Sequence, residues 1–259
     1  MKFLRNLLAH PYTKKLDLDS PNTTALRKNI LKQKPFLRKI YQEWYECINN
    51  QISKDSLTLE IGSGAGFADK IIPNLIKSEV FEVSGVDCIA NACQLPFSDS
   101  SLDAIIMTDV FHHIPDVSKF LEESERCLRV GGKILMIEPW LTWWSKIVYK
   151  NLHHEPFSEY DSNWKLSGSG PLSDANGALP WIIFHRDRMK FEQEHRALKI
   201  TAIVPMMPFS YLLCGGISTR NLIPAFLYKF IRLAESFFPG KYFSMFAFIE
   251  IKKVDSPRI

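Results

Sequence analysis

Short hydrophobic runs alternate along the chain with segments in which apolar residues recur every three or four positions. Runs with the character of buried strands occupy residues 57–61, 78–81, 84–90, 102–108, 133–137, 199–204 and 243–251. Between them we expect helices at 67–76, which Pro73 should kink or shorten, at 117–128, which Gly131 and Gly132 should end, and at 223–237. Strands that alternate with helices predict an α/β fold, with a parallel sheet covered by helices on both faces.

Two segments stand outside this alternation. In residues 1–54, apolar side chains from Phe36 to Ile48 fall at spacings of three and four, so we expect a helical cap packed on the main domain. Residues 140–198 are rich in Trp, His, Pro, Gly and Ser, and because linkers are poor in tryptophan we expect an ordered insertion. It follows a strand directly, so we predict that it forms a substrate wall or lid. The core then comprises 55–139 and 199–253.

Composition and charge restrict the kind of protein that this chain can be. Apolar residues make up 46% and charged residues 23% of the chain, as in an ordinary globular domain. The net charge of +4 is spread without a run of like charges, which does not indicate a nucleic-acid partner but would favour peripheral contact with an anionic membrane surface. Five cysteines without a CxxC pair indicate reduced thiols and a cytoplasmic protein, with a peripheral place at the inner face of the membrane left open. We expect no signal peptide and, since no apolar window of about 18 residues occurs, no membrane span. No pattern specifies the oligomeric state.

Polar residues follow three of the predicted strands at their carboxyl ends, where α/β sheets bind ligands. These residues are Glu60, Thr108, Asp109 and Glu138. Three glycines at alternate positions, Gly62, Gly64 and Gly66, come directly after the first of these strands. A strand, a glycine-rich turn and a helix form the entry to a nucleotide-binding domain, because glycines allow a sharp turn and the close approach of a ligand to the backbone.

Four segments in this order resemble the class I S-adenosylmethionine-dependent methyltransferases. They are LEIGSGAGF at 59–67, NACQLPFSDSSLDAI at 91–105, TDVFHHIPD at 108–116 and CLRVGGKILMIEP at 127–139. The glycines run GxGxG, whereas dinucleotide dehydrogenases have GxGxxG. The resemblance implies a Rossmann-like fold, with a mostly parallel seven-stranded sheet whose last strand is antiparallel, and S-adenosyl-L-methionine as the cofactor.

The insertion and the segment after residue 205 resemble a bacterial subgroup of these enzymes that is associated with cell-envelope polysaccharide biosynthesis. That resemblance implies O-methylation of a sugar or glycan hydroxyl, and the tryptophans agree with it because sugar rings stack on aromatic faces. The apolar segment 206–238 supports an alternative acceptor, a lipid or a quinone-like small molecule. A second alternative is a cofactor-binding protein that has lost the transfer activity.

The resemblance also implies roles for single residues. Those implied to contact the methionine part of the cofactor are Gly62, Ser63, Gly64 and Gly66. Glu60 is implied to lie near its amino group, where a carboxylate complements an ammonium. An acid at the end of the second strand is implied to accept hydrogen bonds from both ribose hydroxyls. We favour Glu79 for that role because it leaves room for a strand before Asn91, and Asp87 is the alternative.

Three further positions complete the implied cofactor site. Asn91 stands where the family usually has an aspartate that binds the adenine amino group, and an asparagine carbonyl accepts the same hydrogen bond. Ala92 is implied to lie along the adenine, and Thr108 next to the transferred methyl group.

Methyl transfer to a hydroxyl requires an aligned nucleophile and removal of its proton. The candidate catalytic residues are His112, His113, Glu138 and His154. One of His112 and His113 either packs under the cofactor loop or acts as the general base. The adjacent His153, His154 and Glu155 lack a regular ligand spacing, so we predict no metal site.

Overall fold

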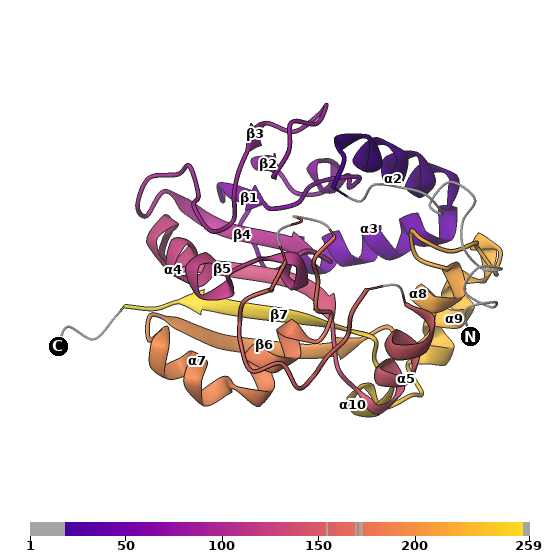
Figure 1. The fold of residues 1–259 in the computed structure, drawn as a ribbon. Coiled ribbons are helices and arrows are strands. Elements are labelled where there is room, and N and C mark those ends of the chain that lie inside the picture. The colour runs from indigo at the N-terminus through magenta and orange to yellow at the C-terminus, as the bar shows by residue number, and fades with distance from the viewer. Residues whose placement is uncertain (1–18, 154, 169, 171–172, 256–259) are drawn as a thin grey trace.

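The fold is built on a seven-stranded sheet with the strand order β3-β2-β1-β4-β5-β7-β6 (Figure 1). It is seen in a computed structural model that describes residues 19–153, 155–168, 170 and 173–255. The strands are β1 (Thr58–Glu60), β2 (Leu75–Glu79), β3 (Cys88–Ile89), β4 (Leu102–Thr108), β5 (Leu128–Pro139), β6 (Leu198–Met206) and β7 (Phe246–Lys253). The pairs among β1 to β5 are parallel, whereas β7 runs antiparallel to both β5 and β6. The expected mostly parallel sheet with an antiparallel last strand is therefore confirmed.

Helices and helical turns surround the sheet. The longer ones are α2 (Pro21–Gln33), α3 (Pro35–Asn49), α4 (Val117–Cys127), α5 (Trp143–Leu152), α7 (Arg188–Glu194) and α9 (Tyr228–Glu235). The shorter ones are η2 (Ala68–Lys70), η3 (Phe111–His113), α6 (Leu179–Trp181), η4 (Ile182–Arg186), α8 (Ser210–Cys214), η5 (Ala225–Leu227) and α10 (Gly240–Phe243). In Figure 1, α2, α3, α8 and α9 gather at the end of the sheet toward which β4 and β5 point. No helix among the described residues has both the length and the apolar character needed to cross a bilayer.

The predicted apolar face of α3 is buried along its whole length, from Phe36 to Ile48. At its centre the Trp44 ring stacks on Tyr211 of α8, with ring centroids 5.7 Å apart, and packs against Phe246 of β7 at 4.9 Å. The Trp44 indole N–H also donates to the sulfur of Met207 at 3.2 Å. The N-terminal helices therefore share the core of the sheet, and this core fixes α3 beside the carboxyl ends of the strands.

The helix expected at 67–76 does not form. Only the 3-10 turn η2 occurs there, and β2 already begins at Leu75. Pro73 has no N–H to donate to a helix, and Asn74 adopts a left-handed conformation with φ of 50°. The crossover from β1 to β2 is consequently short, which places Glu79 at the carboxyl end of the second strand.

Three other predicted boundaries also differ from the structure. Gly131 and Gly132 lie inside β5 and do not end α4, because Leu128 after the helix is already extended. The expected helix at 223–237 is divided into η5 and α9, and the strand expected from 243 begins at Phe246, after α10. Strand β4 and helix α4 agree with the predicted ranges to within one residue.

Candidate functional site

An open pocket lies at the carboxyl ends of β1, β2 and β4, with about 1040 Å³ of space that includes its open mouth. The sheet contributes to its lining Glu60, Ile61, Gly62, Ser63, Gly64, Ala65, Gly66, Glu79, Val80, Ala90, Asn91, Ala92, Thr108, Asp109, Val110, His113, Ile114 and Pro115. The rest of the lining is Thr24, Arg27, Tyr41, Tyr45 and Ile217. The predicted glycine turn and two of the predicted cofactor acids, Glu60 and Glu79, thus meet in one cavity.

The glycine turn is tightly packed, and a side chain on it would not fit. Gly62 has φ of +69°, and a Cβ atom added there would lie 2.6 Å from a methyl group of Val110. A Cβ atom on Gly66 would collide with the hydroxyl of Tyr45. The backbone N–H of Ser63 donates to the carbonyl of Ser78 at 2.9 Å, which ties the turn to β2. The turn is therefore held rigidly, with bare backbone on the pocket wall.

Two buried carboxyl groups face this turn. Burial raises the pKa of Glu60 to about 7, against an opposing effect of the Ser63 hydroxyl. Burial also raises the pKa of Glu79, although the backbone N–H groups of Val80 and Gly64 donate to its carboxylate and act in the opposite direction. Glu60 and Glu79 are both residues for which the sequence predicted a contact with the cofactor.

Asp87, the alternative candidate for the acid that binds the ribose, lies outside the pocket lining. The exposed Asp87 accepts a hydrogen bond of 2.8 Å from the backbone N–H of Lys77 and is not among the residues that line the pocket. The geometry therefore favours Glu79 over Asp87. Asn91 and Ala92 both line the pocket, and the Asn91 side-chain carbonyl already accepts the backbone N–H of Cys93 at 2.9 Å. A carbonyl oxygen has two lone pairs, so it can accept a second donor.

The end of β4 places two polar residues, Thr108 and Asp109, on the pocket lining. The Thr108 hydroxyl is buried and has no hydrogen-bond partner among the described residues, although the residue lines the pocket. Asp109 adopts a left-handed conformation with φ of 61°, and its backbone N–H donates to the carbonyl of Ile137 at 2.8 Å. Burial raises the pKa of Asp109 to about 7, while the nearby His112 opposes this shift. Because it faces the pocket, the Thr108 hydroxyl is available for a hydrogen bond to a ligand or to water.

The N-terminal helices supply pocket residues that the sequence analysis did not select. Arg27 comes from α2, and Tyr41 and Tyr45 come from α3. Burial raises the pKa of both tyrosines, so their hydroxyls remain protonated. Arg27 makes no ion pair with any residue in the described ranges. The only signal in the sequence was the position of the tyrosines on an apolar helix face, which predicts packing and not a place in a ligand site.

Of the candidate catalytic residues, His113 alone among those described lines the pocket. His112 is buried behind it, between Glu138 at 2.7 Å and Glu155 at 3.3 Å. Burial alone would lower the pKa of His112, but the hydrogen bonds to Glu138 and Glu155 hold it well above its usual value. Burial and repulsion by His112 lower the pKa of His113 to about 4. His154 lies outside the described residues.

Glu138 is completely buried and has a positioning role. Its Oε1 atom accepts the backbone N–H groups of Val110 and Phe111, both at 2.8 Å, and its Oε2 atom is paired with His112. The carboxylate therefore holds the η3 turn together and orients His112. It is not among the residues that line the pocket.

The insertion contacts the residues of the η3 turn and not the pocket itself. Its described residues do not line the pocket, nor does any tryptophan of the chain. Instead the Asp174 carbonyl lies 2.9 Å from His113 Nδ1, and the backbone N–H of Asn176 donates to the carbonyl of His112 at 3.0 Å. The walls of this pocket come from the sheet, α2 and α3, and a role of the insertion in binding a larger acceptor stays a prediction.

Comparison with known proteins agrees with this geometry. Residues 59–136, which extend from β1 into β5, match the family model described as a methyltransferase domain. Over 49 residues the chain is 45% identical to the ubiquinone/menaquinone biosynthesis C-methyltransferase UbiE of Bartonella bacilliformis. That match covers 19% of this chain and 19% of the curated relative, so only about a fifth of the relative's length is matched.

Two solved structures have the same fold over nearly the whole chain. One belongs to the complex of the Haloferax volcanii Trm112 methyltransferase activator with a methyltransferase, at 11% identity and a TM-score of 0.53, and covers 93% of this chain and 99% of that chain. The other is the geranyl diphosphate C-methyltransferase of Streptomyces coelicolor A3(2), solved with Mg²⁺, geranyl diphosphate and S-adenosyl-L-homocysteine, at 13% identity and a TM-score of 0.51. It covers 95% of this chain and 92% of that chain. At these identities the likeness shows the fold alone, and it confirms the expected Rossmann-like methyltransferase fold.

Proposed function

We propose that the protein is an S-adenosyl-L-methionine-dependent methyltransferase. The observation that carries this proposal is the convergence of the Gly62–Gly66 turn, Glu60, Glu79 and Thr108 on one pocket of a methyltransferase fold. The residues present fit the cofactor, because the turn offers bare backbone, the carboxyl groups offer acceptors, and the Thr108 hydroxyl lacks a protein partner.

Each part of the lining has a place in holding the cofactor. The Glu60 carboxylate would complement an ammonium group beside the glycine turn. Glu79 would accept hydrogen bonds from two ribose hydroxyls, since a carboxylate has two oxygens. Asn91 and Ala92 would lie along the adenine. When bound, the cofactor supplies an electrophilic methyl group on a sulfonium.

The protein must then position the acceptor and accept its proton. Asp109 and His113 line the pocket at the end of β4, next to the unpartnered Thr108 hydroxyl. We assign proton acceptance to Asp109, because it lines the pocket while both ring nitrogens of His113 face Asp174 and Glu155. Arg27 would neutralise negative charge that develops on the acceptor side of the pocket.

Calorimetric titration with S-adenosyl-L-methionine and S-adenosyl-L-homocysteine tests the cofactor assignment. We expect saturable binding that Glu79→Gln weakens about tenfold, the loss typical of a charged hydrogen bond. Asp87→Asn is the matched control, since it removes a carboxylate from the neighbouring strand without touching the pocket, and it should bind like the wild type. Absence of binding at millimolar cofactor, or equal losses in both variants, would contradict the proposal.

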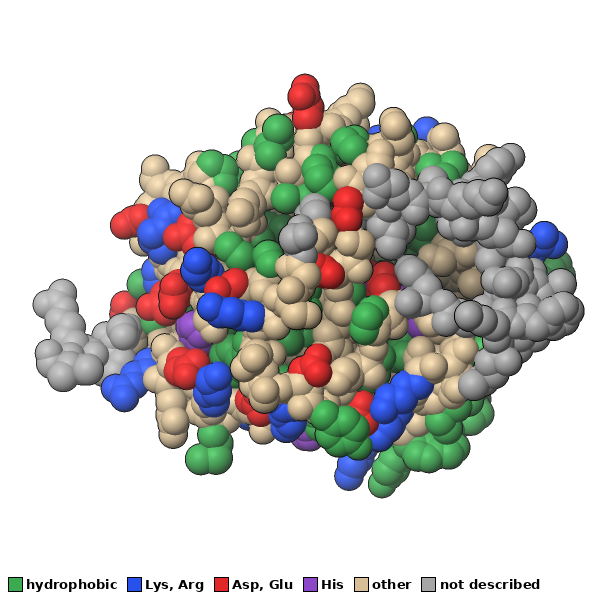
Figure 2. All heavy atoms as spheres, viewed as in Figure 1, with side chains coloured by type: hydrophobic (Ala, Val, Ile, Leu, Met, Phe, Trp, Pro, Cys, Tyr) green, Lys and Arg blue, Asp and Glu red, His purple; other side chains and the backbone are tan. Residues whose placement is uncertain are grey.

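The protein has a large exposed apolar surface, and this surface bears on the class of molecule that accepts the methyl group. Its most exposed members on η5 and α9 are Phe226 at 75%, Phe230 at 72%, Leu233 at 61% and, just beyond, Phe237 at 79%. Trp143 of α5 continues it through ring contacts with Phe243 and then Phe238. In Figure 2, green side chains gather near α5, α9 and α10 at the lower right, with lysine and arginine side chains beside them.

Helix α9 is held with its apolar side facing outward. Its inner side carries Arg232, which forms ion pairs with Glu43 of α3 and with the buried Glu235. Glu235 in turn accepts the backbone N–H groups of Phe209 and Ser210. These polar contacts, together with packing of Tyr228 on Phe36 and of Ile231 on the core, attach the helix to the domain, and its phenylalanine side chains stay exposed. An amphipathic helix with exposed aromatic residues and nearby lysines is typical of proteins that lie on anionic membranes.

We therefore propose that the protein docks on the inner face of a membrane and methylates an acceptor that the lipid phase carries. The first candidate acceptor is a sugar hydroxyl of a lipid-linked glycan in envelope polysaccharide synthesis. The second is a lipid or a quinone-like ring, and the local similarity to UbiE over 49 residues supports it. Stacking of the sugar on a tryptophan gains no support, because no tryptophan lines the pocket.

Sedimentation with vesicles tests the docking. We expect the wild type to pellet with phosphatidylcholine vesicles that contain phosphatidylglycerol, and the double variant Phe226→Ser/Phe230→Ser to stay in the supernatant. Met189→Ser, which changes an equally exposed apolar residue on α7, is the control and should pellet. The membrane assignment would be contradicted if the wild type stays in the supernatant. It would also be contradicted if the wild type is a dimer without lipid and the double variant is a monomer.

The acceptor class is tested by mass spectrometry of products. Vesicles loaded with undecaprenyl-linked sugars or with a demethylated quinone are incubated with protein and cofactor. A mass increase of one methyl group on the glycan supports the first candidate, and one on the quinone ring supports the second. Cofactor binding with transfer to neither would favour the non-catalytic alternative.

A further inference from the structure

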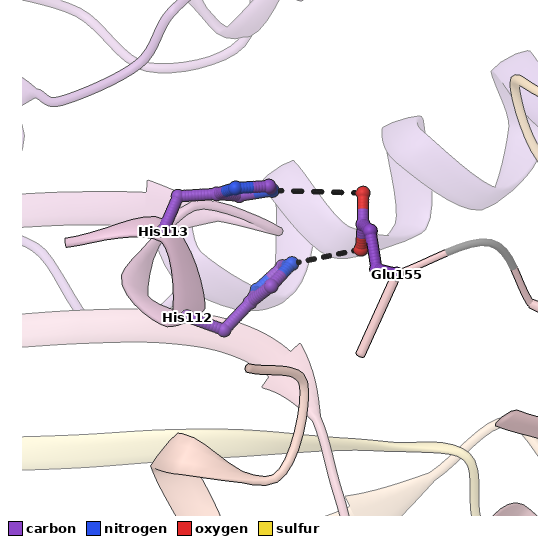
Figure 3. A group of neighbouring side chains, drawn as sticks. All are labelled: His112, His113 and Glu155. Atoms are coloured by element: carbon purple, nitrogen blue, oxygen red, sulfur yellow. Dashed lines mark hydrogen bonds and ion pairs between the residues drawn. The ribbon is translucent and has the colours of Figure 1, made fainter. Parts of the chain in front are cut away.

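His112 and His113 of η3 and Glu155 of the insertion direct their side chains toward one point (Figure 3). Each residue offers one ligand atom, and these three atoms all lie within 4.8 Å of one another. We propose that these three side chains bind a divalent late first-row transition-metal ion of the Zn²⁺ type. This inference does not depend on the proposed function.

The hydrogen bonds of the two rings leave both Nε2 atoms for a ligand. His113 Nδ1 lies 2.9 Å from the backbone carbonyl of Asp174, and because a carbonyl only accepts, Nδ1 carries the hydrogen. His112 Nδ1 lies 2.7 Å from Glu138 Oε2 and is the donor to that carboxylate. Both Nε2 atoms face the carboxylate of Glu155. The raised pKa of His112 places a proton on its Nε2 atom as well, and a bound metal ion would displace that proton to take the lone pair.

The spacing of these atoms agrees with coordination. His112 Nε2 lies 3.3 Å from Glu155 Oε2, and His113 Nε2 lies 3.7 Å from Glu155 Oε1. Charge-assisted hydrogen bonds between such groups are shorter, about 2.7–2.9 Å. Two ligand atoms that each lie about 2.1 Å from one metal ion are separated by about 3.0–3.4 Å at tetrahedral or octahedral angles. The three ligand atoms lie up to 4.8 Å apart, so a cation between the rings and the carboxylate would require the side chains to move closer together.

The surroundings of the rings are those of a metal site. Metal-bound histidines almost always donate their second ring N–H to a carboxylate or a backbone carbonyl. Here His112 has the first kind of partner and His113 the second. Glu138 is itself fixed by two backbone N–H groups, so the orientation of His112 is set before any ion binds. All of this geometry is absent from the sequence pattern, in which Glu155 is far from both histidines.

The donor set also selects the ion. Two imidazole nitrogens and one carboxylate suit Zn²⁺, Fe²⁺, Co²⁺ or Ni²⁺, whereas Mg²⁺ and Ca²⁺ prefer oxygen ligands alone. His113 lines the main pocket, so the ion would lie at the pocket wall. Glu155 belongs to the insertion, so the ion would tie the insertion to η3.

Cobalt and zinc titrations of chelator-treated full-length protein test the site. We expect one equivalent of Co²⁺ to give saturable visible absorption, Zn²⁺ to displace it and Mg²⁺ not to. His113→Gln and Glu155→Gln should each weaken Zn²⁺ binding, measured by calorimetry, at least about tenfold. Glu138→Gln, which changes only the orienting partner of His112, should weaken it by about 10–100-fold. The exposed His185→Gln is the matched control and should bind like the wild type.

Thermal unfolding provides a second measurement for variants that fold poorly. Zn²⁺ should raise the Tm of the wild type and of His185→Gln, and should leave the Tm of His113→Gln unchanged. A wild type without a saturable one-equivalent site would overturn the proposal and assign the cluster to proton sharing alone. Wild-type affinity in both His113→Gln and Glu155→Gln would overturn it as well, whatever the outcome of the cofactor titrations.

Discussion

His112 Nδ1 lies 2.7 Å from Glu138 Oε2, and at most 1% of either side chain is exposed. Two residues that the sequence suggested as alternative bases thus engage each other behind the pocket wall. Their contact orients His112 and fixes the η3 turn through the backbone of Val110 and Phe111. His113 and Asp109, by contrast, line the pocket.

We first predict that Glu138→Gln destabilises the fold. Removal of one charge from a fully buried pair leaves His112 without its partner, and the free energy of unfolding should fall by about 3 kcal/mol. Urea denaturation followed by circular dichroism measures this change. Asp99→Asn, which breaks an exposed ion pair with Arg126, should cost less than about 1 kcal/mol. Similar costs for the two variants would contradict the assigned role of Glu138.

Cofactor binding should depend on pH through Glu60. Because burial raises its pKa to about 7, the carboxylate that complements an ammonium is formed mainly above that pH. Affinity for S-adenosyl-L-methionine should therefore rise about tenfold between about pH 6 and pH 8. Calorimetry at both pH values measures it, and Glu60→Gln should remove the dependence. The same raised pKa contributes stability below the usual carboxyl value of 4.5, and that contribution is lost as the pH rises through about 7.

The Thr108 hydroxyl should matter for ligands and not for folding. It has no hydrogen-bond partner in the described structure, so Thr108→Val should change the free energy of unfolding by less than about 1 kcal/mol. Loss of one neutral hydrogen bond to a ligand should lower kcat/KM about two- to tenfold. Thr108→Ser keeps the hydroxyl and serves as the control in both measurements. A Val variant with unchanged kinetics would remove Thr108 from the site.

Substitution of Gly62 should be more harmful than substitution of another glycine with positive φ. Gly62→Ala places a Cβ atom 2.6 Å from Val110 at φ of +69°, whereas Gly131→Ala has φ of +86° and nothing within 4 Å. Backbone strain alone should cost about 1 kcal/mol in Gly131→Ala. The clash should raise the cost to about 2–3 kcal/mol in Gly62→Ala and displace the glycine turn. Urea denaturation and cofactor titration of the two variants separate strain from steric contact.

The central strands and the glycine turn were predictable because their signals are local. Strand β4 contains the apolar run Ala104 to Met107, and Glu60 followed by alternate glycines marks the ligand end of β1. The amphipathic period of α4 likewise determines its buried face. The helix expected at 67–76 failed because two local breakers, Pro73 and the left-handed Asn74, outweigh the apolar spacing.

Other parts of the site depend on tertiary placement that no local pattern contains. Tyr41 and Tyr45 enter the pocket because Trp44 fixes α3 against α8 and β7, and Arg27 reaches it from the neighbouring helix α2. The position of Glu155 next to His112 depends on a path through the insertion that periodicity does not describe. The orientation of α9 follows from the ion pair of Arg232 with the buried Glu235 and from the packing of Tyr228 and Ile231, whereas the apolar spacing alone does not tell which apolar residues stay exposed.

The packing of Trp44 between Tyr211 and Phe246 has a consequence for synthesis on the ribosome. An N-terminal helix reaches its final place only after β7, near the end of the chain, has emerged. Contacts of such long sequence separation form late, so the nascent chain keeps the apolar face of α3 open to solvent or to chaperones for most of translation. A nascent chain stalled before Phe246 would therefore carry α3 without this aromatic contact.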